Sequence, residues 1–305
     1  MPELPEVETT TRGLRKEIVG LKIKEVWTDL NTKDKRQKEN IANAKYFPIF
    51  KKEISGKKII STERRAKNIL INLSGGKTIL IHMKMTGHLL YGKYHLISKK
   101  WIPNDKNSPL ADPYNRFVHV VFTLSNNKNL AFSDARKFGK ITLLDTKTAH
   151  DTKHLNNIGP DPLDKNFTLK VLKERLSKKP NGKIKTVLMD QSILAGIGNI
   201  YSDEILWRAS IHPERKVSQI KELEFKKIYT ATKELLKKGI NFGGDSMSDY
   251  RNIYGLPGKF QLHHEAYRRN GEQCRYKDCK KNNKNVIIRK IINGRSSHFC
   301  PNHQK

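Results

Sequence analysis

Cysteine is scarce in this chain of 305 residues, and all three copies (Cys274, Cys279 and Cys300) lie near the C-terminus. An odd, clustered set argues against a disulfide framework and favours a metal site. The sequence also lacks an apolar run of membrane-spanning length and a basic-then-apolar leader with a cleavage site. We therefore expect a soluble, cytoplasmic protein with no membrane partner.

Acidic residues are the second shortage. The chain has 30 Asp and Glu against 60 Lys and Arg, which gives a formal net charge of +30. A charge of this size favours a polyanionic partner, and nucleic acid is the first choice. The alternative is a general enrichment in lysine on solvated faces, which is common in basic proteins.

The length suits two domains, and the pattern changes once along the chain. After a helix expected over residues 5–18, short runs rich in β-branched and aromatic residues predict a β-sandwich. The segment 156–166 contains two prolines and predicts a connector, and beyond it the apolar period is helical. The fold class is therefore α+β, with an N-terminal helix and β-sandwich followed by a helical domain.

The N-terminal stretch MPELPEVE suggests chemistry at an amine. A residue as small as Pro2 permits removal of the initiator Met1, which exposes a secondary amine. An α-amino group has a pKa of about 7.7–8.0, so part of it is neutral near pH 7 and able to attack a sugar carbon. Glu3 could then shuttle protons. The alternative is that Glu3, Glu6 and Glu8 are only favourable first-turn helix residues.

The C-terminal segment has the spacing C-x4-C-x20-C-x2-H, formed by Cys274, Cys279, Cys300 and His303. Three thiolates and an imidazole suit one structural Zn²⁺ in a closed tetrahedral site. The strand-like residues 285–299 between the ligand pairs predict a β-hairpin. Free buried thiols are the alternative, and His298 is a second candidate for the fourth ligand.

Seven ordered segments resemble the formamidopyrimidine-DNA glycosylases, the Fpg (MutM) branch of the Fpg/Nei family. The resemblance spans nearly the full length and both expected domains. Leu4 favours the Fpg branch, because the Nei branch usually has glycine there. The segments are MPELPEVE (1–8), RRAKNILINL (64–73), IHMKMTGHL (81–89), FSDARKFG (132–139), IGPDPL (158–163), the long run from Ile184 to Arg215, and GRSSHFCPNH (294–303).

The resemblance implies catalytic roles for four residues. Pro2 corresponds to the nucleophile that forms a Schiff base, and Glu3 to the proton donor that opens the sugar. Lys67 matches a lysine assigned to β-elimination and phosphate binding. Arg295, at the hairpin turn, matches an arginine that contacts the lesion phosphate and assists δ-elimination.

The resemblance also implies DNA contacts and a domain plan. Met85, Arg136 and Phe138 match the trio that fills the gap left by an extruded nucleotide, and Asn199 and Lys185 match contacts to the DNA backbone. Residues 241–260 match a flexible loop that closes over an oxidised purine. The expected regions are a catalytic β-sandwich (1–150), a linker (151–166), a helix–two-turns–helix domain with the lesion loop (167–265) and a zinc finger (266–305).

Some positions depart from the family pattern. The finger usually reads C-x2-C-x16-C-x2-C, so this one is longer and ends in histidine. Phe117 stands where the family has a DNA-contacting histidine. Asn181 stands where the family has a basic residue, with Lys179 and Lys183 as possible substitutes, so the grip on the DNA backbone is expected to be redistributed.

The combined expectation is a monomeric bacterial enzyme, associated with the nucleoid through its substrate. It would act on duplex DNA containing oxidised purines (8-oxoguanine, formamidopyrimidines) or abasic sites, and would cleave the strand by β,δ-elimination. Two alternatives remain. One is an enzyme of the Nei branch acting on oxidised pyrimidines, and the other is a non-catalytic zinc-finger protein that binds DNA.

Overall fold

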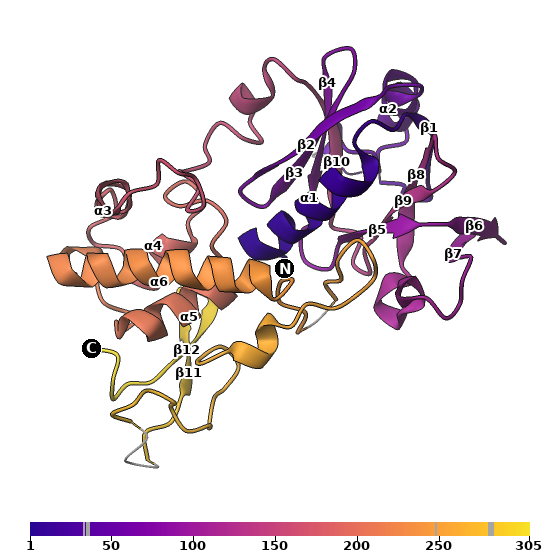
Figure 1. The fold of residues 1–305 in the computed structure, drawn as a ribbon. Coiled ribbons are helices and arrows are strands. Elements are labelled where there is room, and N and C mark those ends of the chain that lie inside the picture. The colour runs from indigo at the N-terminus through magenta and orange to yellow at the C-terminus, as the bar shows by residue number, and fades with distance from the viewer. Residues whose placement is uncertain (33, 35–36, 248, 280–283) are drawn as a thin grey trace. The chain divides into compact units, whose positions relative to one another are not determined.

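Two compact units make up the chain in a computed structural model that describes residues 1–32, 34, 37–247, 249–279 and 284–305. The first unit contains Met1–Asn156 together with Phe242–Lys259, and the second contains Asn157–Asn241 together with Phe260–Lys305. Figure 1 shows the helices and strands of both. Each unit is described by itself below.

The first unit is a β-sandwich preceded by a helix. Helix α1 (Leu4–Ile18) opens the chain, and α2 (Tyr46–Ile54) lies between the first two strands. One antiparallel sheet has the order β1-β8-β9-β5, and the other has the order β10-β4-β3-β2. The strands are β1 (Ile23–Thr28), β2 (Ile59–Arg65), β3 (Asn68–Leu73), β4 (Lys77–His82), β5 (His88–Gly92), β8 (Val118–Leu124), β9 (Asn129–Ser133) and β10 (Lys140–Asp145).

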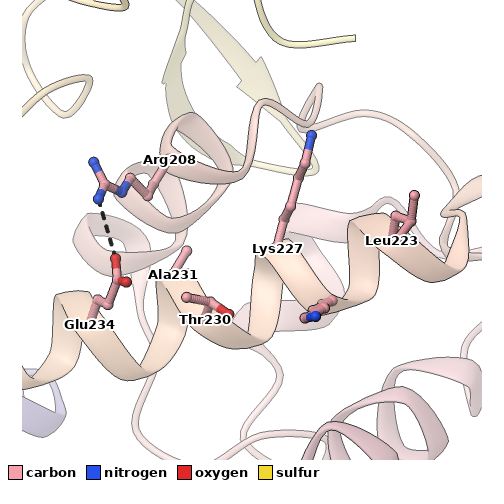
Figure 2. A pocket seen from close by; sticks show the side chains of 7 residues that line it. Arg208, Leu223, Lys227, Thr230, Ala231 and Glu234 are labelled. Atoms are coloured by element: carbon pink, nitrogen blue, oxygen red, sulfur yellow. Dashed lines mark hydrogen bonds and ion pairs between the residues drawn. The ribbon is translucent and has the colours of Figure 1, made fainter.

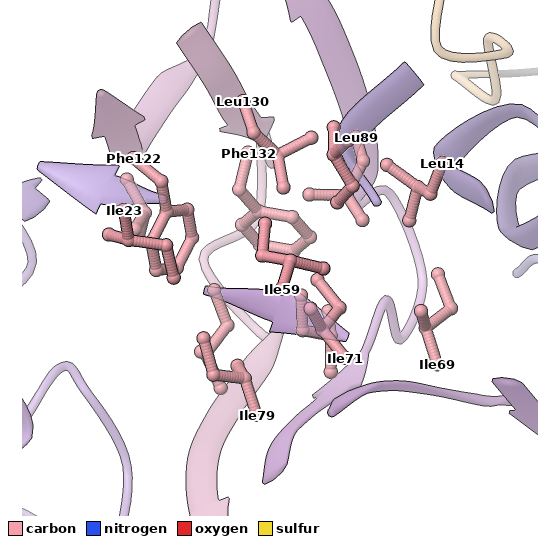
Figure 3. Packing of buried hydrophobic residues seen from close by; sticks show 14 of the residues in the cluster. Leu14, Ile23, Ile59, Ile69, Ile71, Ile79, Leu89, Phe122, Leu130 and Phe132 are labelled. Atoms are coloured by element: carbon pink, nitrogen blue, oxygen red, sulfur yellow. The ribbon is translucent and has the colours of Figure 1, made fainter. Parts of the chain in front are cut away.

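The core of this unit forms from the alternation of apolar residues along the strands. Side chains at every second position point to the same face, so a strand such as β3 presents Ile69 and Ile71 together. Figure 3 shows these isoleucines packed near Phe132 and Leu14, which belong to β9 and α1. The sandwich predicted from the short strand-like runs is confirmed.

Helix α1 is attached to strand β2 by polar contacts as well as by its apolar stripe. The Arg64 side chain donates to Glu8 with an Nε–Oε2 distance of 2.7 Å, and both side chains are largely buried. Arg15 donates to the carbonyl oxygen of Thr62, and the Thr62 hydroxyl donates to that of Thr11. These contacts fix the start of the chain on the sheet.

A small hairpin and two short 3₁₀ helices extend the first unit between β5 and β8. The hairpin pairs β6 (Tyr94–Ile97) with β7 (Lys100–Pro103), and its turn residues Ser98 and Lys99 have positive φ angles. The 3₁₀ helices η2 (Pro109–Ala111) and η3 (Pro113–Asn115) follow. The sequence did not predict these elements individually.

The second unit is helical and ends in a β-hairpin. Its helices are α3 (Leu169–Ser177), α4 (Ile184–Met189), α5 (Asn199–Ala209) and α6 (Glu222–Asn241). The hairpin pairs β11 (Ile288–Ile292) with β12 (Arg295–Phe299). The remaining 3₁₀ helices are η4 (Ala149–Asp151) in the first unit, and η5 (Val217–Gln219) and η6 (Phe260–His263) in the second. The α+β class, the helical domain and the hairpin agree with expectation.

One segment is grouped differently from the sequence-based plan. Residues 242–259 pack with the first unit, whereas the plan placed them in the 167–265 domain. The backbone N–H of Tyr91 donates to the carbonyl oxygen of Ile253, and the Ile253 side chain is buried in the sandwich core. Residue 248 of this segment and residues 280–283 of the expected finger lie outside the described part.

No helix in the described ranges has both the length and the apolar character needed to cross a membrane.

Candidate active site and metal centre

The start of α1 holds the residues expected to carry the chemistry. Pro2 and Glu3 are both buried, and Glu3 is 2% exposed. Glu6, one turn into the helix, accepts a hydrogen bond at Oε2 from the backbone N–H of Glu3 at 2.7 Å. Acceptance of this N–H by a first-turn carboxylate is half of a capping box. It fixes the backbone next to Pro2.

The three early glutamates have different environments. Burial, together with the nearby Glu3 carboxylate, raises the pKa of Glu6 to about 7. Glu8 is also affected by burial, but its hydrogen bonds to Arg64 and Arg12 outweigh that effect and lower its pKa. Environments that separate the pKa values of neighbouring acids are typical of acid–base sites. First-turn helix preference alone does not account for a buried Glu6.

Residues 242–259 are joined to this cluster through Glu6. Its Oε1 accepts from the backbone N–H of Asp245 at 2.8 Å, and its carbonyl oxygen accepts from the Tyr250 hydroxyl at 3.0 Å. Gly244 has a φ of +92°, and a Cβ there would lie 2.9 Å from the Tyr250 ring and 3.0 Å from the Glu6 side chain. Glycine is therefore required at this close approach. Glu6 links the start of α1 to residues 242–259, the expected lesion loop.

Lys67 lies in the turn between β2 and β3 and is 5% exposed. His82 lies opposite Asn68 on the neighbouring strand. Burial, and the positive charges of Lys84, Lys67 and Lys140, lower the pKa of His82 to about 3. His82 Nδ1 accepts from the backbone N–H of Lys84, so the neutral ring carries its hydrogen on Nε2. This corner of the sheet concentrates positive charge.

The expected gap-filling trio is exposed and held by one carboxylate. Met85 is 41% exposed and Phe138 50% exposed, and Arg136 stacks over the Phe138 ring at 4.5 Å. Asp134 accepts hydrogen bonds from the Thr86 hydroxyl, from the Gly139 backbone and from the Arg136 backbone. Asp134 therefore ties the turn that carries Met85 to the turn that carries the other two residues. Such exposed apolar side chains are suited to contact a partner.

Asn199 is the first residue of α5, and the turn before it is braced by Gln191. The Gln191 amide accepts from the backbone N–H of Gly196 and donates to the carbonyl oxygen of Ile197. Gly196 has a φ of +86°, which favours glycine. The Asn199 side chain lies 3.4 Å from the Ser296 hydroxyl of the hairpin. The start of α5, with its backbone N–H groups, is a position at which a phosphate could bind.

Lys185, expected as a second backbone contact, is fully buried in the structure. Its Nζ donates to Asp203 Oδ1 and to the carbonyl oxygen of Ser296, each at 2.6 Å. Asp203 also accepts from the Ser297 hydroxyl and from the backbone and ring of His298. Lys185 and Asp203 therefore fix the hairpin to helices α4 and α5.

The two expected substitutes for a basic residue at Asn181 are paired with acids. Lys179 contacts Asp190, and Lys183 contacts Glu214 at 2.8 Å. The Lys183 hydrogen bond, with a second one from Lys290, lowers the pKa of Glu214 to about 2. Both lysines are partly exposed. A phosphate would have to compete with these carboxylates for them.

Arg295 is exposed at the start of β12, directly after the hairpin turn. Asn293 and Gly294 both have positive φ angles, as tight hairpin turns require. The turn therefore places the guanidinium at the tip of the hairpin, while Ser296 and Ser297 behind it contact the helices.

Cys274, Cys279, Cys300 and His303 lie together as a group that could hold a metal ion, with all four ligand atoms within 4.8 Å of one another. The Sγ atoms of Cys279 and Cys300 are 3.7 Å apart. Zn–S bonds of about 2.3 Å in a tetrahedron separate two sulfurs by ~3.8 Å, so the spacing fits zinc. Burial raises the pKa of Cys279 to about 12, so a bound cation would be needed to hold the thiolate form.

The orientation of His303 distinguishes it from His298. His303 Nδ1 faces Cys274 Sγ at 3.4 Å, while Nε2 lies 3.0 Å from the carbonyl oxygen of Trp207. Tyr276 stacks on the imidazole at 4.2 Å, and the Trp207 indole donates to Cys274 Sγ. His298 points instead to Asp203. The structure brings His303, and not His298, to the three cysteines.

A hollow of about 430 Å³ is lined by residues of α6 and by Arg208 near the end of α5. Figure 2 shows its lining, which includes an ion pair between Arg208 and Glu234. Leu223 there is 74% exposed. None of the residues predicted from the sequence lines this hollow.

Two residues were not given roles by the sequence analysis. In the sequence, Glu6 stands out only as an acid that is favourable in a first helical turn. His82 lies within the segment IHMKMTGHL (81–89), and no role was predicted for it. Glu6 could have been recognised from its position three residues after Glu3, the N-cap of α1. His82 could have been recognised from its place at the end of strand β4, opposite Asn68 and next to the turn that contains Lys67.

Comparisons with known proteins agree across the whole chain. The family profile described as Formamidopyrimidine-DNA glycosylase N-terminal domain matches residues 1–141, and that described as Formamidopyrimidine-DNA glycosylase H2TH domain matches residues 158–251. Formamidopyrimidine-DNA glycosylase of Pelotomaculum thermopropionicum is 37% identical, covering 100% of this chain and 99% of the relative. That of Heliobacterium modesticaldum is 36% identical, covering 100% of both.

Solved structures give the same answer. The complex between Lactococcus lactis Fpg and DNA containing an abasic site matches with a TM-score of 0.81 and 31% identity, covering 99% of both chains. The complex of the wild-type Lactococcus lactis protein with DNA containing N7-benzyl-Fapy-dG has the same TM-score and identity, covering 100% of both chains.

Proposed function

The chain belongs to the formamidopyrimidine-DNA glycosylase family and is a DNA repair glycosylase, and from this premise we propose that it excises oxidised purines from duplex DNA and cleaves the strand at the resulting abasic site. The observation that carries the proposal is the buried cluster of Pro2, Glu3 and Glu6 at the start of α1. The proposed substrate class, 8-oxoguanine and formamidopyrimidines, follows from the resemblance of this chain to the family. We propose that the protein acts as a monomer.

The first step uses the Pro2 nitrogen, which becomes a secondary amine once Met1 is removed. Its lone pair attacks C1′ of the damaged nucleotide, the bond from C1′ to the base breaks, and the base leaves with that electron pair and takes up the proton that the Pro2 nitrogen loses. Glu3 donates a proton to O4′ as the sugar opens, which leaves an iminium between Pro2 and C1′. Because the amine is secondary, the iminium is cationic without further protonation.

The iminium then acts as an electron sink for strand cleavage. Loss of a proton from C2′ expels the 3′ phosphate by β-elimination, and loss of a second proton expels the 5′ phosphate by δ-elimination. Water finally hydrolyses the iminium and regenerates the amine. Lys67 and Arg295 are proposed to bind the flanking phosphates during these steps, and their positive charges favour phosphate departure.

The remaining residues are proposed to hold the duplex. Met85, Arg136 and Phe138 would occupy the space that the extruded nucleotide leaves. An empty position in the base stack costs a few kcal/mol, on the order of one lost stacking step, so filling it is favourable. Asn199 and Lys183 would contact the DNA backbone, and the buried Lys185 would act indirectly by holding the hairpin against α4 and α5. One Zn²⁺ bound by the three cysteines and His303 would stabilise the fold of the hairpin that carries Arg295.

Borohydride trapping on single-lesion duplexes tests this function. Only an iminium is reduced to a stable covalent adduct, so trapping separates an enzyme from a DNA-binding protein. Duplexes carrying 8-oxoguanine or a formamidopyrimidine should give adducts faster than duplexes carrying thymine glycol. Faster trapping on thymine glycol would favour the oxidised-pyrimidine preference of the Nei branch, and no trapping on any lesion would contradict catalysis.

A further inference from the structure

The β6–β7 hairpin and the 3₁₀ helices after it enclose a pocket that none of the proposed steps uses. The pocket has a volume of about 530 Å³, within the range of sites that bind small ligands or single side chains. It lies entirely within the first unit. Its lining comes from β7, from η2 and η3, from the start of β8 and from Asp29.

The floor of the pocket is apolar. Trp101, Leu110 and Phe117 are half-buried, and Val118 is buried. Trp101 packs edge-on against Trp27 at 6.0 Å, which leaves the rest of its side chain to the pocket wall. Its indole N–H is inaccessible to solvent and has no hydrogen-bond partner among the described residues. Because solvent cannot reach this N–H, Trp101 offers a ligand apolar surface rather than a hydrogen bond.

The rim of the pocket is positively charged. Lys99, Lys100, Lys106 and Arg116 are all exposed, and none forms an ion pair within the described part of the chain. The two acidic side chains in the lining are already occupied. Asp29 contacts His119 at 2.9 Å, and Asp112 contacts Arg251 at 3.3 Å. The net field at the mouth therefore attracts anions.

Apolar exposure continues along the same hairpin. Leu96 is 47% exposed and Ile97 is 51% exposed, immediately before the turn that carries Lys99. An apolar pocket bounded by cations, with exposed aliphatic side chains on the adjoining hairpin, is suited to a segment that carries both carboxylates and apolar side chains.

We propose that this pocket binds an acidic peptide segment of a partner protein, with one aromatic side chain on the Trp101 floor and carboxylates on the lysine and arginine rim. A peptide fits better than a nucleobase. Base recognition requires several free polar groups, but the Asn115 amide is already used at both ends, by His88 and by the carbonyl oxygen of Pro109. One face of Phe117 is covered by Arg116, which reduces the surface for base stacking.

The test measures fluorescence anisotropy of a short fluorescein-labelled peptide rich in aspartate, with one central phenylalanine. Two companion peptides replace the phenylalanine by alanine or the aspartates by asparagine. A labelled single-stranded oligothymidine serves as the nucleic-acid probe. We expect the parent peptide to bind and both companions to bind about tenfold more weakly, because each lacks one of the two complementary features.

Matched charge reversals locate the binding. The variant Lys99→Glu/Lys106→Glu removes two rim cations, and the control Lys52→Glu/Lys147→Glu changes the net charge equally at exposed lysines elsewhere in the same unit. We expect a loss of about tenfold in peptide affinity for the rim variant and little change for the control. Thermal unfolding checks that both variants are folded. Trapping on lesion duplexes should persist in both, so failure here is distinguishable from failure of the proposed enzyme function.

Equal losses in the two double variants would mean that the peptide is attracted by overall charge alone, and would overturn the proposal. It would also be overturned if the oligothymidine, and not the peptide, distinguished the rim variant from the control, since the pocket would then be a nucleic-acid surface. If Trp101→Phe reduces peptide affinity and leaves the unfolding temperature unchanged, this would support the proposal that the aromatic side chain of the peptide packs on Trp101.

Discussion

The Nε2 atom of His303 lies 3.0 Å from the carbonyl oxygen of Trp207. A carbonyl only accepts hydrogen bonds, so the Nε2 atom carries the hydrogen and the Nδ1 lone pair is directed to the cysteine sulfurs. The histidine that departs from the usual four-cysteine pattern is thus oriented by the helix beneath it. Its tautomer is set before any metal binds.

The first prediction concerns zinc. Purified protein should contain one Zn²⁺, and His303→Ala should release it faster to a chromophoric chelator, whereas His303→Cys should retain it by restoring a thiolate. Zinc binding contributes folding free energy on the order of 10 kcal/mol in finger peptides, so Cys300→Ser should unfold the hairpin while the sandwich stays folded. Metal analysis without stoichiometric zinc would contradict this assignment.

The second prediction concerns the nucleophile. Protein that retains Met1, confirmed by intact mass, should bind duplex DNA but give no borohydride adduct, because the Pro2 nitrogen is then an amide. Pro2→Gly should also lose the secondary amine and trap poorly. Trapping at the normal rate by protein that retains Met1 would rule out Pro2 as the attacking group.

The third prediction concerns Glu6 and pH. Because its folded pKa of about 7 exceeds the unfolded value of 4.5, neutral Glu6 stabilises the fold fully below pH 4.5, and this stabilisation is lost as pH rises towards 7. The loss amounts to at most about 3 kcal/mol. Glu6→Gln should therefore be more stable relative to the parent at about pH 8 than at about pH 5, as measured by urea unfolding.

Glu8→Gln provides a control of opposite sign. The lowered pKa of Glu8 means that its ionised form stabilises the fold above the unfolded pKa, and that this contribution is lost as pH falls. The variant should lose most stability relative to the parent near neutral pH and less in acid. Parallel pH profiles for the two variants would contradict the assigned environments.

The fourth prediction concerns the buried pair of Lys185 and Asp203, whose side chains are 1% and 0% exposed. Asp203→Ala should lower the unfolding free energy of the second unit by about 3–5 kcal/mol, because it leaves a buried ammonium without its carboxylate. Lys185→Met combined with Asp203→Leu should recover much of this loss. Denaturant unfolding measures both, and no recovery would indicate that the other Asp203 contacts dominate.

The fifth prediction concerns phosphate contacts. Asn199→Ala and Arg295→Ala should both weaken duplex binding. Only Arg295→Ala should also reduce the slope of log affinity against log salt by about 0.9, because it removes a cation that displaces a counterion. Binding isotherms over a range of salt measure this. An unchanged slope for Arg295→Ala would contradict its phosphate role.

Periodicity predicted the sandwich strands and the helices of the second unit well, because their apolar faces alternate with a regular period. It did not predict α2, which is only nine residues long and contains Pro48 in its first turn. It also did not resolve the β6–β7 hairpin, whose exposed Leu96 and Ile97 give no inward-facing pattern. The packing of residues 242–259 with the first unit depends on Ile253 filling a distant core, which local sequence does not encode.

The candidate site was predictable in its residue types but not in its electrostatics. Resemblance assigned the roles of Pro2 and Glu3, and the spacing of the cysteines and His303 predicted the metal group, whose expected members lie together. The contrast between Glu6 and Glu8 arises from burial and from Arg64, which is 56 positions away from Glu8 along the chain. The burial of Lys185 likewise depends on Asp203 and the hairpin, so a lysine expected at the DNA backbone proved to be part of the internal packing.

The carboxylate of Asp134, which joins the turn bearing Met85 to the turn bearing Arg136 and Phe138, has a consequence for how the protein would search DNA. Turns that are already fixed relative to one another lose little conformational entropy when their side chains enter a base stack. A preassembled wedge could therefore probe successive base pairs without reordering at each one. The two turns are joined when the protein folds, so this cost does not recur at each base pair. An intact base pair would resist insertion of these side chains mainly through its own stacking and pairing energy, and a weakened base pair would open first.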